Sequence, residues 1–371
     1  FRLKSWRRSS RIVLERNPNY REVRFDAIAP EGDAQAEATA RALAGVRLPL
    51  LDRIEISSID ESQPRWLAFL GGELDTILMP PSFAPVAVPN GQLAPYLAKR
   101  GVQVRRTLSS TVTHTFFNFD DAQVGGYTPE KVALRRAIAL AYDNASDIRL
   151  IYNGLALPAQ SMMAPHNYGF DAKLKSEMSE HSPARANALL DLYGYARASD
   201  GWRRHPDGKT LELRLASTTD QRARQLNELW DKRMAAVGLR MRFEAAPFGE
   251  LIKRALAGQL QMWGYSWSNG PDGDFFLGLA YGPNADQSND ARFKLPAFDR
   301  LYEKQTVMPN GPERLAVMRE AQKLMLAYVP YIAHVHPIDT DLSHAPVRHL
   351  IRHPFKATWW HFTDLAAAPP A

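Results

Sequence analysis

Residues 211–244 read LELRLASTTDQRARQLNELWDKRMAAVGLRMRFE, and this stretch decides the fold class. Apolar and polar residues alternate over residues 211–216 and again over residues 239–244, which is the pattern of strands with one buried face. Residues 220–236, which lie between them, favour a long helix. The order strand, helix, strand predicts a parallel sheet in an α/β protein.

Elements of the same kinds are predicted on both sides of this stretch. Residues 128–141 and 182–193 favour amphipathic helices, because each run opens with a Thr-Pro or Ser-Pro pair that supplies an N-cap and a first-turn proline. Residues 312–328 show the period of another helix. Residues 1–16 read as strand, Ser-rich turn and strand, so the chain is expected to begin inside a sheet. Residues 80–95 hold many prolines and are predicted to be loop.

The composition favours a globular chain of more than one domain. Its 371 residues are 45% hydrophobic, which is enough to bury large cores. The 46 Lys and Arg residues exceed the 40 Asp and Glu residues, but both signs are scattered along the chain, so no nucleic-acid partner is expected. Cysteine is absent, which excludes disulfides, thiolate metal sites and Cys nucleophiles and is compatible with an oxidising compartment.

The stretch QMWGYSWSNGPDGDFF at residues 261–276 is the strongest candidate for a binding site. It predicts a short strand that runs into a loop rich in Gly, Pro and Asp. Its aromatic rings can stack on a ligand, and its polar side chains can make directional contacts. The candidate ligand-binding residues are Tyr265, Trp267, Ser268, Asn269, Asp272 and Asp274. The alternative is that the aromatic residues belong to the core and the Asp and Gly residues only form a turn.

Two histidines raise the question of a metal site. His334 and His336 place two imidazoles on one face of a predicted strand. They would ligate a metal only if Asp339, Asp341 or His344 supplied a third ligand. Because two-ligand spacing is a weak signal, histidines with ordinary hydrogen bonds are the preferred interpretation, and we assign neither a metal site nor a cofactor.

Known signatures of catalysis are missing from the sequence. The sequence contains no G-x-S-x-G, no P-loop, no G-x-G-x-x-G after a strand and no H-E-x-x-H. We therefore predict no catalytic residues and expect a protein that is not an enzyme.

Six landmarks occur in a fixed order along the chain. They are FRL at 1–3 with RIVLERNPNY at 11–20, GGELD at 71–75, VALRRAIALAYD at 132–143 with IYNG at 151–154, ARANALL at 184–190, AVGLRM at 236–241, and the stretch from WGY to DFF at 263–276. In this order and spacing the chain resembles family 5 of the bacterial extracellular solute-binding proteins, which includes dipeptide, oligopeptide and nickel receptors. The resemblance spans nearly the whole chain.

The resemblance implies an architecture. The fold would be α/β, that of a two-lobed, type II-like periplasmic binding protein of the class with an extra small lobe, here without its N-terminal part. Residues 1–113 plus 329–371 would form an incomplete lobe I that carries the chain ends, and residues 114–328 the C-terminal α/β lobe that binds the ligand. The hinge would lie near Thr113 and Val329. Residues 1–113 are expected to expose apolar surface that the missing part covers.

The resemblance also implies a function. The protein would be the periplasmic substrate-binding component of an ABC importer for peptides or a related small solute, closing by a hinge around its ligand and delivering it to the permease. Its partners would be a small-molecule or peptide ligand and the ABC permease membrane subunits, and the protein itself would be a monomer. It would lie in the periplasm of a Gram-negative cell, exported by a signal sequence absent from this chain.

One departure from the family leaves the ligand open. In peptide-binding members an acidic residue of the 263–276 stretch pairs with the ammonium of the ligand, and an ungapped match puts Ser268 at that position. A hydroxyl does not neutralise an ammonium, so peptides with a free N-terminus are expected to bind poorly unless Asp272 or Asp274 reaches the same point. The alternative function is a metal-binding or sensory ligand-binding protein with the same fold.

Overall fold

The structure is a computed structural model, and it describes residues 1–355 and 358–366. The chain forms two compact units, which are described separately below. Unit 1 comprises residues 1–107 and 339–371, and unit 2 comprises residues 108–338. The two positions predicted for the hinge, Thr113 and Val329, both lie within unit 2. Unit 2 is therefore longer at both ends than the ligand-binding lobe expected from the sequence, whose boundaries stay a prediction.

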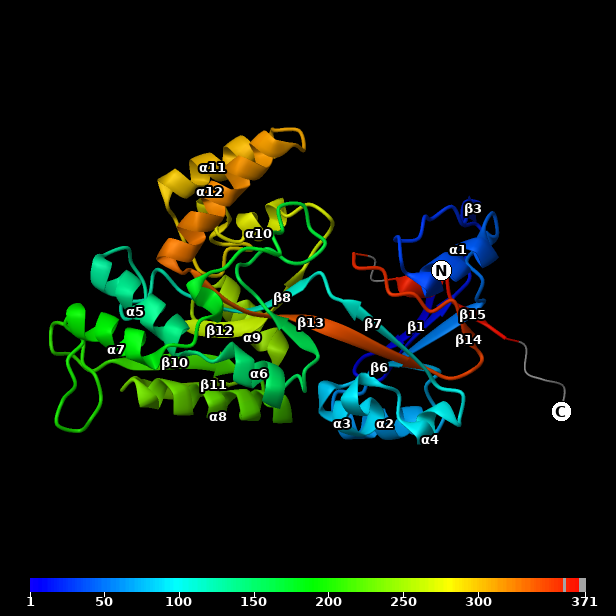
Figure 1. Ribbon diagram of the computed structural model, residues 1–371, viewed down its shortest axis with the longest axis horizontal. Helices are drawn as coiled ribbons and strands as arrows, with labels where there is room; N and C mark the ends of the chain where they lie inside the picture. The colour runs from blue at the N-terminus through cyan, green and yellow to red at the C-terminus, as the bar shows by residue number, and fades with distance from the viewer. Residues whose placement is uncertain (356–357, 367–371) are drawn as a thin grey trace. The chain divides into compact units, whose positions relative to one another are not determined.

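Unit 2 is built on a mixed sheet (Figure 1) whose strands run in the order β11, β10, β12, β8 and β13, with β9 also paired to β13. These strands are β8 (Thr111–Phe117), β9 (Ala156–Pro158), β10 (Glu212–Ser217), β11 (Arg240–Ala245), β12 (Met262–Ser268) and β13 (Tyr331–Ser343). Strand β10 is parallel to both β11 and β12, whereas β8 is antiparallel to both β12 and β13. The parallel sheet predicted from residues 211–244 is confirmed for this part of the unit.

Helices cover the sheet of unit 2, and several begin as the sequence predicts. They are α5 (Pro129–Ala141), α6 (Asn144–Leu150), α7 (Pro183–Leu192), α8 (Gln221–Ala236), α9 (Phe248–Leu256), α10 (Asp274–Gly278), α11 (Pro296–Thr306) and α12 (Pro312–Tyr328). Helices α5 and α7 pack side by side, as do α11 and α12, and α8 lies along β11 (Figure 1). Short 3₁₀ turns occur at Glu177–Ser179 and Gly282–Asn284.

Apolar alternation explains how β12 is held in the sheet. Met262 and Trp263, at its start, are buried in the core of the unit. Beyond them the strand presents Tyr265 and Trp267 to one face, where they pack against the core, and Ser266 to the other, where it is exposed. Strand β12 thus carries core residues at one end and accessible side chains at the other.

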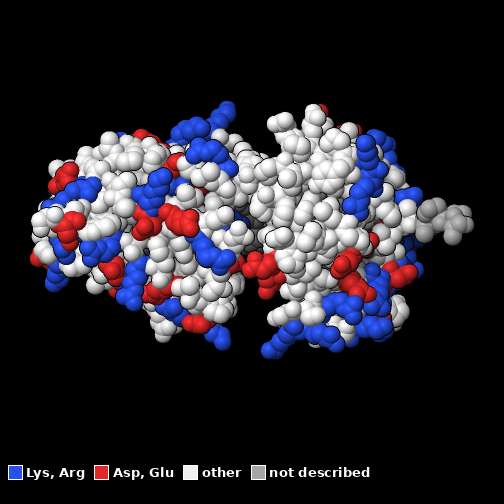
Figure 2. Space-filling model, turned by 90° about the horizontal axis from the view of Figure 1, so that it is seen from below, with Lys and Arg blue, Asp and Glu red and all other residues white. Residues whose placement is uncertain are grey.

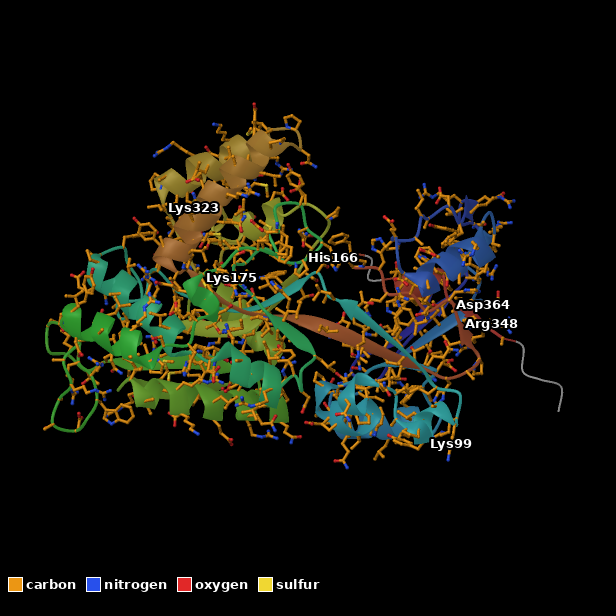
Figure 3. The ribbon with its side chains drawn as sticks, in the orientation of Figure 1. Lys99, His166, Lys175, Lys323, Arg348 and Asp364 are labelled. Atoms are coloured by element: carbon orange, nitrogen blue, oxygen red, sulfur yellow. The ribbon has the colours of Figure 1, made fainter. Side chains whose placement is uncertain are left out.

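Unit 1 contains a three-stranded sheet and several short elements. The strands are β1 (Arg2–Arg7), β2 (Arg11–Glu15), β3 (Val23–Arg24), β4 (Arg47–Leu48), β5 (Arg53–Ser57), β6 (Thr76–Leu78), β7 (Gln103–Leu108, whose last residue belongs to unit 2), β14 (Val347–Arg348) and β15 (Asp364–Leu365). The helices are α1 (Ala34–Leu43), α2 (Ser62–Leu70), α3 (Ala84–Ala87) and α4 (Pro95–Ala98), with 3₁₀ turns at Pro81–Phe83, Pro89–Gly91 and Trp359–His361. Arg348 and Asp364, labelled in Figure 3, are partners in the β14–β15 pair.

Two expectations for unit 1 have different outcomes. The predicted opening hairpin is confirmed, because β1 and β2 pair antiparallel and β2 then pairs with β5. The prediction that residues 80–95 are loop is wrong, since this segment forms short helical turns, each with a proline in its first turn. Proline lacks only an N–H that a first helical turn leaves unpaired, so it starts a helix as readily as it breaks one.

Apolar side chains remain exposed on the three-stranded sheet. All residues of β1 are exposed, and the exposed fractions of Leu3 and Trp6 are 58% and 62%. On the neighbouring strand, Ile12 and Leu14 are half-buried. Exposed apolar surface, as expected for residues 1–113, is therefore present here.

The surface of unit 2 is mixed in charge. On the face seen in Figure 2, Lys and Arg alternate with Asp and Glu rather than forming a field of one sign. Within residues 1–355 and 358–366, no helix has the length and apolar composition needed to cross a bilayer.

Candidate functional site

A cavity of about 550 Å³ lies within unit 2, beyond the carboxyl end of β10. The last residues of β10, with parts of β8, β12 and β13, form one side of it, and α8, α6 and the ends of α5 and α9 form the other. Ligands of open α/β sheets gather beyond the carboxyl ends of strands, and small-molecule sites have volumes of about 300–1,000 Å³. This cavity is therefore the candidate binding site.

Aromatic side chains form much of the cavity wall. They come from five different parts of the chain and are Tyr142, Tyr152, Trp230, Phe248, Trp263 and Tyr265. The ring centroids of Trp263 and Tyr265 are 4.6 Å apart, and those of Tyr142 and Trp230 are 4.4 Å apart. Most of these rings are buried, but Phe248 is half exposed and marks the opening of the cavity. Such walls favour a ligand that can stack.

A buried ion pair reaches the cavity wall through Asp147. The hydroxyl of Tyr142 donates a hydrogen bond to one carboxylate oxygen of Asp147, and Nη1 of Arg233 donates to the other at 2.9 Å. Burial raises the pKa of Asp147, and the charge of Arg233 opposes this shift. Because both side chains are less than a tenth exposed, the pair takes its two charges out of water together. Its net contribution to the charge of the cavity is zero.

Two buried histidines also line the cavity. Nε2 of His334 lies 2.8 Å from the Thr115 hydroxyl, and its Nδ1 lies 3.1 Å from Oδ1 of Asn144. Since the amide nitrogen of Asn144 donates to the Met178 carbonyl, its oxygen accepts, so Nδ1 of His334 carries the proton. Burial lowers the pKa of His334 to about 3.

The second histidine has fewer polar neighbours. His114 packs between the rings of Tyr265 and Tyr331, with centroid distances of 4.9 and 5.3 Å. Burial lowers its pKa to about 3, against a small opposing effect of the Val112 carbonyl. Both histidines are therefore uncharged at neutral pH.

Hydroxyl groups provide uncharged hydrogen-bonding positions on the sheet side. The hydroxyl oxygens of Thr113 and Ser266 are 2.9 Å apart, and the hydroxyl of Tyr152 lies 3.4 Å from that of Thr113. A hydroxyl can both donate and accept, so this strip can serve amides and hydroxyls of a ligand alike.

Two opposite charges stand at the start of α8. Asp220 caps the helix, because its Oδ1 accepts from the Ala223 amide at 3.0 Å and its Oδ2 accepts from the Thr218 hydroxyl at 2.6 Å. Partial burial raises the pKa of Asp220, but these two hydrogen bonds, together with the backbone amides of Asp220 and Arg222, outweigh it and hold the pKa below its ordinary value. The guanidinium of Arg222 lies 4.6 Å from the Tyr152 ring centroid, and no carboxylate of the described residues forms an ion pair with it.

Of the residues predicted from the sequence, Tyr265 lines the cavity and Trp267 supports it. Nε1 of Trp267 donates to the Tyr265 hydroxyl at 2.9 Å, and that hydroxyl donates to the carboxylate of Asp290. Burial raises the pKa of Asp290 to about 6. Trp267 also packs edge to face on Phe275, with ring centroids 5.4 Å apart. Tyr265 thus contributes to the cavity wall, and Trp267 packs against the core and holds Tyr265 in place.

The other predicted residues lie outside the lining of this cavity. Ser268 and Asn269 are exposed beyond it. Asp272 accepts two hydrogen bonds from Arg314, at 2.6 and 3.0 Å, and this pair fixes the loop to α12. Asp274 lies in the first turn of α10, and burial and the charge of Asp272 raise its pKa. Their assignment as ligand contacts stays a prediction.

The histidines considered as metal ligands have structural hydrogen bonds. His334 lies in the cavity wall described above, and Nδ1 of His336 lies 3.0 Å from the Thr111 carbonyl. In the part of the chain that the structure describes, no group of three or more His, Asp or Glu side chains is arranged to hold a metal ion.

Sequence reasoning missed most of the cavity lining. Tyr142, Asp147 and Trp230 lie on helices that are distant in the sequence from β12, and the three-dimensional fold brings them together. One signal was available for Asp220 and Arg222, because they directly follow a strand of the predicted parallel sheet, where ligands gather.

Comparison with known families gives one clear match. Residues 1–288 match the family described as "Bacterial extracellular solute-binding proteins, family 5 Middle". This match covers well over half of the chain.

Individual relatives are distant and longer than this chain. The chain is 29% identical to "Di/tripeptide-binding protein 2" of Pseudomonas aeruginosa (strain UCBPP-PA14) over 228 residues, which are 60% of this chain and 39% of the relative. It is 24% identical to "Heme-binding protein A" of Haemophilus influenzae over 310 residues, 82% of this chain and 52% of the relative. The chain thus spans about half or less of the length of these relatives.

Solved structures share the fold. The periplasmic binding protein DppA from Helicobacter pylori, in complex with the peptide STSA, superposes with a TM-score of 0.77 at 19% identity, over 99% of this chain and 62% of that one. NikA from Brucella suis, in complex with Fe(III)-EDTA, superposes with a TM-score of 0.72 at 18% identity, over 96% of this chain and 66% of that one.

Proposed function

This chain belongs to family 5 of the bacterial extracellular solute-binding proteins, and from that membership we propose that it is the ligand-binding part of a substrate-binding protein of an ABC importer. The cavity of about 550 Å³ in unit 2 carries the proposal, because it joins stacking surfaces to uncharged hydrogen-bonding groups at the position where α/β proteins bind small molecules. The partners are a small solute and the membrane permease.

We infer that the protein binds its solute without changing it. Asp147 is engaged with Arg233 and Tyr142, and His334 with Thr115 and Asn144. The ring nitrogens of His114 make no hydrogen bond to any described residue, but both nitrogens are buried. A general base or nucleophile needs a hydrogen-bonding position open toward the substrate. The relatives are likewise named as binding proteins.

Family membership leaves the solute open, because the relatives differ in what they are named for. One is named for di- and tripeptides, another for heme, and one solved structure holds a metal chelate. We propose that the solute is a short peptide or another molecule of similar size. A monomeric protein would bind it in the periplasm of a Gram-negative cell. Closure by a hinge then requires a solute that binds the closed state more tightly than the open one, since a ligand with equal affinity for two states shifts neither.

Native mass spectrometry of the full-length protein, purified directly from its own cells, tests the proposal. We expect a mass excess that corresponds to one small molecule and disappears when the protein is denatured and desalted. The same sample, analysed for metals, separates the metal-binding alternative, for which a stoichiometric metal would be found. A protein that retains no molecule, and whose melting temperature no peptide, amino acid or related solute raises, would contradict the proposed function.

A further inference from the structure

We propose that the cavity of unit 2 selects solutes that enter it with an uncharged, planar aromatic group, and that it excludes an ammonium or a carboxylate from its interior. This inference rests on the proposed function and names the class of solute for the same site. It follows from three properties of the cavity, namely its walls, its charges and its hydrogen-bonding groups.

The walls offer stacking surfaces to a flat group. Trp263 and Tyr265 lie at 4.6 Å with an interplanar angle of 30°, and Phe248 closes on Trp263 at 5.5 Å. On the helix side, Trp230 packs on Tyr142 and presents a second aromatic surface to the same space. An aromatic pair gains about 0.5–1.5 kcal/mol beyond the burial of its area, so a ring gains more here than an aliphatic group of the same size.

The interior has no charge left over for a ligand. Both carboxylate oxygens of Asp147 are occupied, one by Arg233 and the other by the Tyr142 hydroxyl. An ammonium beside Asp147 would be a second cation on a carboxylate that Arg233 already neutralises, and an uncompensated buried charge costs about 3–5 kcal/mol. The buried histidines of the lining give a carboxylate no cation, because both His114 and His334 are neutral.

The charges of the other two ionised residues of the lining also cancel. Asp220 and Arg222 stand two residues apart at the start of α8, so their formal charges cancel. The carboxylate of Asp220 is already held by the Ala223 amide and the Thr218 hydroxyl. Arg222 also lines the cavity, but it is exposed and reaches over the Tyr152 ring, and an ion pair with an exposed cation contributes only about 0–1 kcal/mol.

On the sheet side of the cavity, the accessible polar groups are uncharged. Ser266 is exposed on β12, and its hydroxyl is paired with that of Thr113 within 2.9 Å. These hydroxyls can satisfy an amide or hydroxyl of the solute, which is the polar part an uncharged aromatic compound would carry. Walls, charges and hydrogen-bonding groups thus favour the same class.

Three probes that share one indole ring test the inference. N-acetyltryptophanamide is uncharged, tryptophanamide is a cation and N-acetyltryptophan is an anion, each titrated into the 371-residue chain by calorimetry at pH 6.5. We expect the uncharged probe to bind at least about tenfold more tightly than either charged one, a difference of about 1.4 kcal/mol. Equal or tighter binding of a charged probe would overturn the inference, and so would the failure of all three to bind.

Two matched variants locate the binding. Ser266→Trp fills the cavity, whereas Ser268→Trp places the same side chain on the same face of the same strand but outside the cavity lining. We expect Ser266→Trp to weaken the uncharged probe by about tenfold or more and Ser268→Trp to leave it within about twofold. Both serines are exposed, so both variants should keep the melting temperature of the parent.

If Ser268→Trp weakened binding of the uncharged probe more than Ser266→Trp, the binding site would lie at the loop after β12, and the inference would be refuted. That result would leave the proposed function standing. So would the finding that the native solute is charged and that Ser266→Trp does not affect its binding. The proposed function would fall only with the mass-spectrometric result described above, so the two failures are distinguishable.

Discussion

Burial shifts the pKa of single residues that contact β12, and Asp290 is the first example. Asp290 is 5% exposed and accepts a hydrogen bond from the Tyr265 hydroxyl. Burial raises its pKa to about 6, and the nearby cation Arg292 only partly opposes this. Because the pKa is higher in the folded than in the unfolded protein, the stabilising effect is present at low pH and is lost as the pH rises through about 6.

Asp290→Asn should therefore stabilise the protein at alkaline pH. A shift from 3.8 to about 6 corresponds to about 3 kcal/mol of cost for the ionised carboxylate above pH 6, and an amide oxygen can still accept from Tyr265. We expect the free energy of unfolding to rise by about 1–3 kcal/mol at pH 8, with the gain shrinking towards pH 4. Urea unfolding at both pH values measures it.

Asp286→Asn is the matched control, because Asp286 pairs with the same Arg292 but its side chain is 84% exposed. It should have little effect at either pH. An equal gain from Asp290→Asn at pH 4 and pH 8 would show that Asp290 is not buried in its charged form.

His114 gives a pH dependence of opposite sign. Its pKa is lowered from 6.5 to about 3, so the folded state favours the neutral ring, and the stabilising effect is present above pH 6.5 and is lost as the pH falls towards 3. His114→Leu should remove this loss, about 1.4 kcal/mol per pH unit and about 2 kcal/mol by pH 5. The denaturant midpoint, followed from pH 7 to pH 5, measures the change.

His181→Leu, at an exposed position, is the control and should leave the slope unchanged. Because His334 is buried in the same way, parent protein should lose stability below pH 6.5 even though Asp290 becomes easier to accommodate there. An unchanged acid slope in His114→Leu would contradict the buried, neutral state.

The sequence could predict single site residues only where the backbone alone places them. Tyr265 and Trp267 are two residues apart on a strand, so they share a face, and the structure joins them by a hydrogen bond. Trp230 and Asp147 reach the same cavity from separate helices, and no local pattern relates them to β12. The pairing of Asp272 with Arg314, which lies in α12, was equally invisible to local reasoning.

At the level of elements, helix starts differ in how they are capped. Thr128 stands at the N-cap of α5, where the sequence predicts it, but its side chain makes no capping hydrogen bond. Its hydroxyl instead interacts with the side chain of Glu130. Asp143 caps α6, because its carboxylate accepts from the Ser146 amide at 3.0 Å.

Replacing these two residues by alanine should therefore have unequal effects. We expect Asp143→Ala to lower the free energy of unfolding by about 1 kcal/mol, because an N–H of the first turn loses its acceptor. Thr128→Ala, the control, should cost less than half as much. Thermal unfolding of both variants gives the comparison, and equal losses would show that the hydroxyl of Thr128 caps α5 after all.

Strong periodicity made some elements predictable. The alternation in residues 211–216 and 239–244 and the helix between them appear in the structure as β10, α8 and β11 in parallel pairing. The segment 80–95 failed because its prolines were taken only as breakers, although the same residue at a first helical position supports a helix. A signal that permits two structures cannot decide between them without its tertiary surroundings.

At the scale of the whole molecule, the chain divides into two units with separate cores. Residues of the cavity all lie between 108 and 338, within unit 2. The sequence predicted two parts with a hinge near Thr113 and Val329, which stays a prediction, and β13 (Tyr331–Ser343) runs from unit 2 into unit 1. A long strand gives no local mark of the point at which it changes unit.

Calorimetry should resolve two unfolding transitions, only one of which responds to ligand. N-acetyltryptophanamide at about 100 times its dissociation constant should stabilise unit 2 by about 2.7 kcal/mol and leave the other transition in place. Phe69→Ala, which empties a fully buried position of unit 1, should lower the other transition alone. Ser266→Trp should abolish the ligand-induced shift. A single transition that moves as a whole would show that the units unfold as one.

The confinement of the cavity to unit 2 has an evolutionary consequence. The fit of a new solute in the cavity changes through substitutions in a few segments, those of β8, β10, β12, β13, α6, α8 and the helix ends beside them. Residues 1–107 contribute nothing to that lining, so the shape and polarity of the cavity wall do not depend directly on their side chains. After gene duplication, one copy can therefore give its cell access to a new nutrient through substitutions in the cavity wall. Substitutions elsewhere in that copy accumulate, or are selected against, for other reasons.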